Sequence, residues 1–103
     1  MSSYLLTPAA EEDIFEIWRF IASDNPFAAN QLESDIFEAC QRIAQHPDAG
    51  HFRKDLTKRS VRFLQVRRNY LIVYDPDATP VVIVRILHGA RNAEAELKTD
   101  LPN

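Results

Sequence analysis

The chain has 103 residues and a mass of 11.8 kDa, with 46% hydrophobic and 26% charged residues. These values exclude a disordered chain and predict one globular domain over residues 1–103. The net charge of −3 and the pI near 5.5 argue against a protein that binds nucleic acid directly on its own. A single cysteine, no leader peptide and no apolar run near the ~20 residues of a membrane span lead us to expect a cytoplasmic protein.

A short strand is expected first, at residues 3–7, because Pro8 breaks the apolar run there. Thr7 is suited to cap the helix that follows, with Pro8 in its first turn. Apolar residues at i, i+3, i+4 and i+7 give this helix one apolar face, made of Ile14, Ile17, Trp18 and Ile21. The acids near its start are expected to form a solvated face that offsets the helix dipole: Glu11, Glu12, Asp13 and Glu16.

A second helix is predicted to begin at Asn25, which can cap it, with Pro26 in the first turn. It ends at the sequence His-Pro-Asp of residues 46–48. Its apolar stripe consists of Leu32, Ile36, Cys40 and Ile43. Two amphipathic helices with a short polar break between them predict a helical hairpin.

Residues 49–60 are expected to form a loop, with a helical turn near residues 53–57, and three strands follow at 61–67, 70–75 and 81–87. The short connections favour an antiparallel meander. The predicted class is α+β: an N-terminal strand and a helical hairpin packed on an antiparallel sheet, in the order β-α-α-β-β-β. One sheet face covers the hairpin and the other is left for solvent or a partner. Residues 92–98 favour a short C-terminal helix.

Glycine is rare, and each of the two, Gly50 and Gly89, is expected to mark a backbone geometry that other residues resist. The histidines lack the spacing of a zinc site, and no phosphate-binding loop, GxSxG or CxxC is present, so we expect no metal and no cofactor. His88 closes a strand next to Gly89, where a functional role and a structural hydrogen bond are both open.

Cations concentrate in residues 53–68, which hold seven Lys or Arg and only one acid, Asp55. This basic run could face an acidic partner or phosphates, or form a solvated loop and strand edge. Arginines on or beside predicted strands offer planar forks for carboxylate or phosphate: Arg62, Arg67, Arg85 and Arg91. Whether Arg62 and Arg85 share a sheet face depends on the strand register, which the sequence leaves open.

The most specific segment is IVRILHGARN at residues 83–92, a buried strand that ends in a charged turn. Further matching segments are PAAEEDI at 8–14 with Ile17 and Trp18, then Pro47, Gly50, VRF at 61–63 and YLIVY at 70–74. In these residues the chain resembles the ParE branch of the ParE/RelE superfamily, toxins of bacterial toxin-antitoxin (plasmid stabilisation) modules. The resemblance spans nearly the whole chain, and the strand order predicted above is that family's fold.

The resemblance implies one of two activities. RelE-like members resemble ribosome-dependent endoribonucleases: they are strongly basic, carry an arginine after the tyrosine of a YRLVY strand and often have a catalytic tyrosine or histidine near the C-terminus. This chain has Leu71 after Tyr70, Leu97 where that tyrosine would fall, and an acidic total charge. It is more similar to ParE-like members, which stall DNA gyrase on cleaved DNA and perform no cleavage themselves. No catalytic residue is therefore assigned.

The resemblance also implies a ParD-like antitoxin, with a ribbon-helix-helix DNA-binding part and a tail that wraps the toxin. We expect the antitoxin to contact exposed phenylalanines and part of the basic run: Phe15, Phe20, Phe27, Arg53, Lys54 and Arg67. We expect the target to be bound by Arg62, Arg85, His88, Arg91 and Asn92. Two alternatives stay open: a RelE-type endoribonuclease that uses Arg62, His88 and Arg91, and a non-toxic module that only binds its antitoxin.

Overall fold

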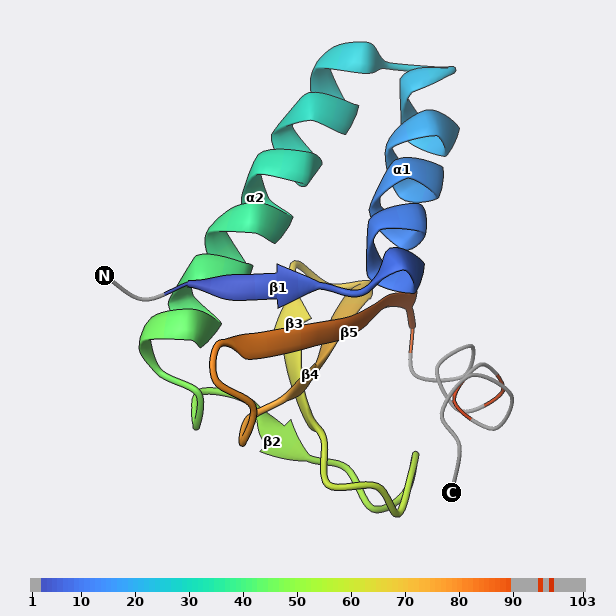
Figure 1. Ribbon diagram of the computed structural model, residues 1–103. Coiled ribbons are helices and arrows are strands. Elements are labelled where there is room, and N and C mark those ends of the chain that lie inside the picture. Colours follow the sequence, from blue (N-terminus) through green and yellow to red (C-terminus); the bar gives the residue numbers. More distant parts are fainter. Residues whose placement is uncertain (1–2, 90–94, 96, 98–103) are drawn as a thin grey trace.

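The computed structural model describes residues 3–89 together with Ala95 and Leu97. A helical hairpin stands on a five-stranded sheet, and the end where the two helices join projects away from the sheet (Figure 1). The predicted α+β class is confirmed. The elements are β1 (Tyr4–Leu6), α1 (Pro8–Ala22), α2 (Pro26–Gln45), β2 (His51–Phe52), β3 (Arg62–Val66), β4 (Tyr70–Asp75) and β5 (Val81–His88).

Both helices begin at the predicted capping residues. The Thr7 side chain accepts a hydrogen bond from the Ala10 N–H at 3.0 Å, and the Asn25 side chain accepts one from the Ala28 N–H at 3.1 Å. The Thr7 hydroxyl also donates to the carbonyl of Val84 at 2.7 Å, so the residue that starts α1 also binds the last strand. None of the helices in the described part of the chain is long and apolar enough to cross a membrane.

The strand order is β1-β5-β4-β3-β2, and β3, β4 and β5 form the predicted antiparallel meander. Two features differ from the expectation. β1 pairs with β5 in parallel, which makes the sheet mixed. The sequence did not predict this direction, because a short turn fixes the relative direction only of the two strands that it joins. β2 lies inside the predicted loop and pairs with β3. The two residues of β2 are too few to show an alternating pattern in the sequence. The helical turn expected in that loop is confirmed, since the Thr57 N–H donates to the Arg53 carbonyl at 3.1 Å.

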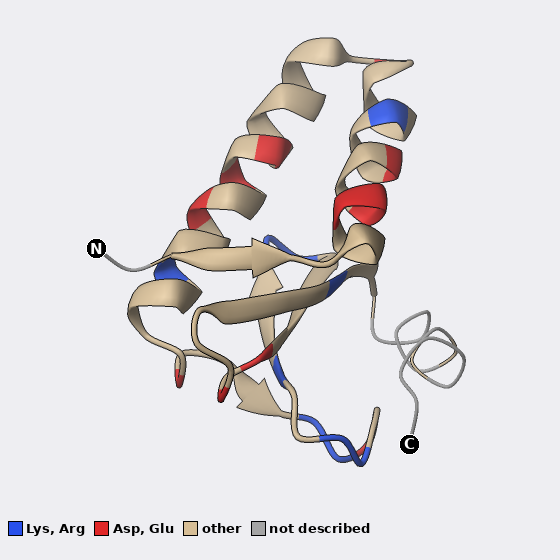
Figure 2. Cartoon of the chain, in the orientation of Figure 1, with Lys and Arg blue, Asp and Glu red and all other residues tan. Residues whose placement is uncertain are grey.

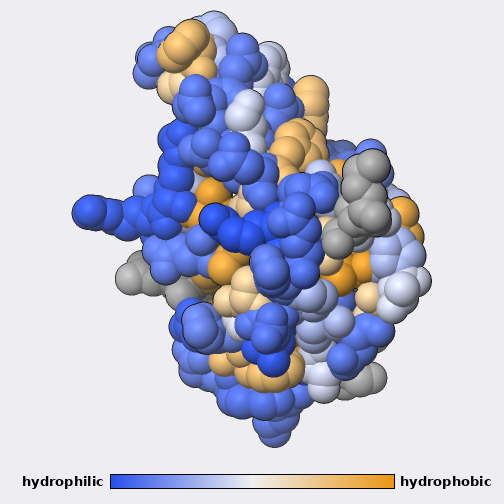
Figure 3. Space-filling model, turned by 90° about the vertical axis from the view of Figure 1, so that its left-hand side faces the viewer, coloured by the Kyte–Doolittle hydropathy of each residue, from blue (hydrophilic) through white to orange (hydrophobic). Residues whose placement is uncertain are grey.

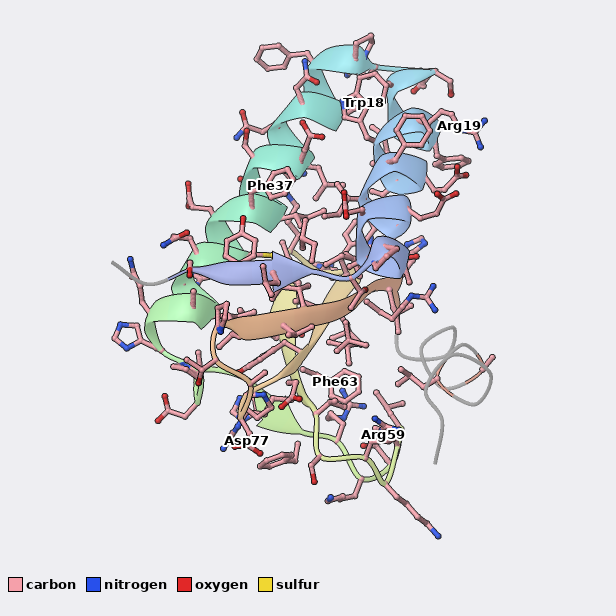
Figure 4. The ribbon with its side chains drawn as sticks, in the orientation of Figure 1. Trp18, Arg19, Phe37, Arg59, Phe63 and Asp77 are labelled. Atoms are coloured by element: carbon pink, nitrogen blue, oxygen red, sulfur yellow. The ribbon has the colours of Figure 1, made fainter. Side chains whose placement is uncertain are left out.

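The main core lies between the hairpin and the sheet. Both predicted apolar stripes reach it, although Trp18 stays only half-buried beside it. Phe37 lies between the two helices in Figure 4 and packs against the same core. The fully buried members of the core include Ile36, Cys40, Ile43, Ile72, Tyr74 and Ile83.

The other sheet face is also covered in part by the chain itself, contrary to the expectation that it is left open. Leu56 from the loop after β2 packs on this face, and so does Leu97, which is 3% exposed. Of the predicted C-terminal helix only Ala95 and Leu97 lie inside the described residues, and both are helical. These groups cover a second cluster on the sheet, made of Val61, Phe63, Leu71, Val73 and Leu87.

Candidate functional site

Arg85 is held inside the fold by Asp13 of α1. The guanidinium donates to the two carboxylate oxygens at 2.7 and 2.9 Å, and the backbone N–H of Ile86 donates to the same carboxylate at 3.0 Å. The two side chains are only 11% and 15% exposed. The expectation of a solvated acidic face is therefore wrong for Asp13, which occupies the edge of β5 beyond the end of β1. Arg85 therefore supports the junction of α1 and β5.

A bulge in β5 explains why the sequence pattern hid this pair. The register between β4 and β5 shifts after Val73, so that Val73 faces Arg85 while Tyr74 faces Ile83. Val84 is the extra residue, and a bulge of this kind turns the next side chain out of simple alternation. A strict period of two therefore could not predict the direction of Arg85.

Arg62 is also engaged within the fold. It pairs across the sheet with Tyr74, donates to the carbonyl of Gly50 at 2.8 Å and lies 4.3 Å from the ring centre of Phe52. The Tyr74 hydroxyl donates to the carbonyl of Pro47 at 2.6 Å and accepts from the Gly50 N–H at 2.8 Å. Burial raises the pKa of Tyr74 above its ordinary value. Arg62 and Tyr74 together fix the loop that leaves α2.

Gly50 and Gly89 confirm that each glycine marks a special geometry, for different reasons. A methyl group at Gly50 would lie 2.7 Å from the Phe63 carbonyl oxygen and 2.8 Å from the Tyr74 hydroxyl oxygen. Gly89 has free space around it but a φ of +81°, which side chains resist. Its N–H donates to the Asn69 carbonyl at 2.7 Å, so the end of β5 is joined to the turn between β3 and β4.

His88 is exposed at this end of β5. Its ring stacks on that of Tyr70, with 4.9 Å between the ring centres and 20° between the planes. The structure thus gives His88 a defined orientation on a rigid strand while leaving the ring accessible. The two other residues predicted for target binding at this end, Arg91 and Asn92, lie outside the described residues.

The predicted phenylalanines lie on the hairpin. Phe20 and Phe27 are 81% and 80% exposed, and Phe15 is 55% exposed. Figure 3 shows apolar residues on the surface at the far end of the hairpin. Behind them the Trp18 indole N–H donates to the Asn30 side chain at 2.8 Å, which ties α1 to α2 (Figure 4). The phenylalanines therefore lie on two helices that a hydrogen bond joins.

The predicted basic residues gather elsewhere, mainly on the loop between β2 and β3 at the opposite end of the molecule (Figure 2). Arg53 pairs with Asp55 at 2.7 Å, and Lys54 lies 5.5 Å from the ring centre of Phe52. Arg67, with a φ of +54°, pairs with Asp35 of α2 at 2.7 Å. The six residues predicted to bind the antitoxin thus lie in three places, the hairpin, the β2–β3 loop and the turn after β3, which one segment can cover only by wrapping the molecule.

A polar hollow of about 120 Å³ lies where the β3–β4 turn meets the end of β5, and sequence reasoning missed it. It draws on three distant parts of the chain, so no local pattern signals it. Within the described ranges, no group of three or more His, Cys, Asp or Glu could hold a metal ion. The hollow is lined by Arg53, Gln65, Arg68, Asn69, Tyr70, Leu71 and Gly89.

Comparison with known proteins places this arrangement among toxins. The family model described as the ParE toxin of the type II toxin-antitoxin system, parDE, matches residues 4–93. Toxin RelE3 of Caulobacter vibrioides is 31% identical over 89 residues, which cover 86% of this chain and 96% of that protein. The solved structure of a chromosomal ParDE system from P. aeruginosa has a similar fold, with a TM-score of 0.71 and 23% identity over 86% of this chain and 97% of that chain.

Proposed function

This chain belongs to the ParE toxin family of type II toxin-antitoxin systems, and on that premise we propose that it inhibits DNA gyrase by binding the enzyme. The observation that carries the proposal is the family match, which extends over residues 4–93. The cytoplasm, where gyrase acts, is the proposed site of action. A ParD-like antitoxin with a ribbon-helix-helix part is the proposed partner that neutralises the toxin.

The contacts that Arg62, Arg85 and His88 make on the sheet favour protein binding over phosphodiester cleavage. A general acid and base must both reach the reacting oxygen atoms. The Arg62 guanidinium is bound to the Gly50 carbonyl and the Arg85 guanidinium is bound to Asp13, so each already has a partner within the fold. His88 stacks on Tyr70, apart from both arginines. The described residues therefore offer an exposed edge for protein contact more readily than a convergent catalytic centre.

For the target surface we propose the end of β5, with His88 as its described member and Arg91 and Asn92 following in the chain. Arg62 and Arg85 also belonged to the predicted target set. Because their guanidinium groups are held within the fold, we propose that they act on the target only indirectly, by keeping β5 and the loop after α2 in place.

For the antitoxin we propose both predicted groups of residues. Phe15, Phe20 and Phe27 on the hairpin present apolar surface for a helix face. Arg53 and Lys54 on the β2–β3 loop, with Arg67 on the turn after β3, present positive charge for an acidic tail. Phe20 and Phe27 contribute most to the contact between the antitoxin and the hairpin, since residues of 80% exposure or more lose the most apolar surface on binding.

The first test is a supercoiling assay with the purified chain, DNA gyrase, relaxed plasmid and ATP. We expect inhibition with trapped cleaved plasmid, and relief when the antitoxin encoded beside the toxin is added. A folded chain that leaves supercoiling unchanged would rule out gyrase as the target.

The RelE-type endoribonuclease is the second candidate, favoured by the 31% sequence identity to a protein named Toxin RelE3 and by the arginines around the polar hollow. Cleavage of mRNA on ribosomes, abolished by replacing Arg62, His88 and Arg91, would establish it. A third candidate is a non-toxic antitoxin-binding module. Harmless expression of the folded lone chain, with tight antitoxin binding, would favour it.

A further inference from the structure

The outer edge of β3 is open beside the polar hollow. β2 pairs only with Arg62 and Phe63, so residues 64–66 of β3 have no strand partner on that side within the described part of the chain. The Phe63 carbonyl oxygen faces Gly50, on the β2 side. Successive residues of an antiparallel strand point their backbone groups to alternate sides. The N–H and C=O of Gln65 therefore also point to the outer edge, past the end of β2.

Cations surround this open edge. Gln65 lines the polar hollow together with Arg53 and Arg68, one from each flank of β3. Arg68 is exposed and makes no ion pair with any residue that the structure describes. The nearby carboxylates are already used, since Asp55 pairs with Arg53 and Asp35 pairs with Arg67. The edge thus offers main-chain hydrogen bonds next to guanidinium groups with spare donors.

The other exposed edge of the sheet lacks this charge. β1 has only three residues, and residues 3–7 contain no Lys or Arg. The phenylalanine surface on the hairpin carries acids along the same helices (Figure 2). An extended segment that bears carboxylates is therefore attracted to the β3 edge and repelled from the hairpin.

We propose that an acidic, extended peptide segment of the partner adds as a strand to β3 at Gln65, in line with β2, and places its carboxylates on Arg68 and Arg53. The backbone of Gln65 supplies the main-chain pairing, and the hollow admits an acidic side chain. This inference rests on the proposed function, because the antitoxin tail is the source of the segment.

A synthetic octapeptide of alternating valine and glutamate is the probe, added to the full chain without antitoxin or gyrase. Binding is followed by fluorescence anisotropy, and amide hydrogen exchange is measured by NMR. We expect protection of the Gln65 amide, with the β1 amides unchanged. Arg68→Glu should weaken binding about tenfold, as expected for a charge-assisted contact. Arg42→Glu, an exposed arginine on α2, is the matched control and should leave binding unchanged.

Two further peptides separate strand addition from simple charge attraction. Each is N-methylated on every second amide, one starting at the first amide and the other at the second. Equal binding by the methylated peptides would overturn the inference, as would no binding at about 1 mM peptide. Protection of β1 instead of Gln65, or tighter binding of a DNA oligonucleotide to the same edge, would also overturn it. Because the assay needs no gyrase, gyrase inhibition without peptide binding contradicts only this inference. Peptide binding without inhibition contradicts only the proposed target.

Discussion

Asp13 accepts hydrogen bonds from the Arg85 guanidinium with both carboxylate oxygens, and one of these oxygens also accepts from the backbone of β5. One side chain from the start of α1 thus pairs with a cation that is only 11% exposed and accepts from a strand-edge N–H that β1 is too short to reach. The pair joins the helical hairpin to the strand that leads toward the proposed target surface.

Removing this carboxylate should destabilise the protein strongly. Asp13→Ala leaves the largely covered Arg85 charge without this carboxylate and the Ile86 N–H without its acceptor, so we expect a loss of about 3 kcal/mol in the free energy of unfolding. Urea denaturation measures it. Glu12→Ala, one residue away and exposed, is the control and should change stability by less than about 0.5 kcal/mol. Equal effects of the two variants would show that the pair contributes little.

Gly50 should be far less tolerant of a methyl group than Gly89. Gly50→Ala forces overlap with the Phe63 carbonyl and the Tyr74 hydroxyl, and we expect a loss of about 2–3 kcal/mol. Gly89→Ala meets only the left-handed backbone penalty of about 1–2 kcal/mol, because its surroundings are open. Thermal denaturation of both variants gives the ranking, and the reverse order would contradict the close approach at Gly50.

Cys40 should make stability fall at high pH. Burial raises the pKa of its thiol from 9.0 to about 12. The unfolded chain therefore releases the proton near pH 9, while the folded chain keeps it until about pH 12. Stability from this group is fully present below pH 9 and falls by about 1.4 kcal/mol per pH unit above it. Cys40→Ala should show a shallower decline in urea denaturation between pH 9 and 11. An unchanged slope would mean that the thiol does not contribute.

The hairpin phenylalanines should matter for the antitoxin and not for the fold. Phe20→Ser and Phe27→Ser remove side chains that are 81% and 80% exposed, so we expect stability changes below about 0.5 kcal/mol. Antitoxin affinity should fall about tenfold or more for each, by calorimetric titration. Leu5→Ser, also exposed but on β1, is the control. Undiminished affinity in both phenylalanine variants would move the antitoxin contact off the hairpin.

The end of β5 should carry gyrase inhibition. His88→Ala and Arg91→Ala should each raise the concentration needed for half-inhibition about tenfold, the loss of one contact at a binding centre. For His88→Ala we expect little change in stability, because the ring is exposed. Arg62→Ala should instead lower stability, since the Gly50 carbonyl loses its donor. Inhibition unaffected by either of the first two changes would place the target surface elsewhere.

Local signals in the sequence predicted most of the fold. Thr7 and Asn25 cap their helices through contacts three residues away, and such contacts can be read from the residue types alone. The site depended on distant partners instead. Asp13 looked like one of four solvated acids, and only a bulge in a strand 72 residues later places Arg85 against it. The polar hollow and the burial of Leu97 arise the same way, from segments that no local window joins.

The hydroxyl of Thr7 binds the carbonyl of Val84 across 77 residues, at the point where the first strand becomes the first helix. During synthesis the hairpin therefore emerges long before the strand on which it docks. β5 lies between β1 and β4, so β1 cannot join the sheet until that strand is made. A nascent chain stopped before residue 81 lacks both the strand and the surface that we propose for the target. Toxicity should thus appear only with the finished protein, and messages cut short should yield harmless, rapidly degraded fragments.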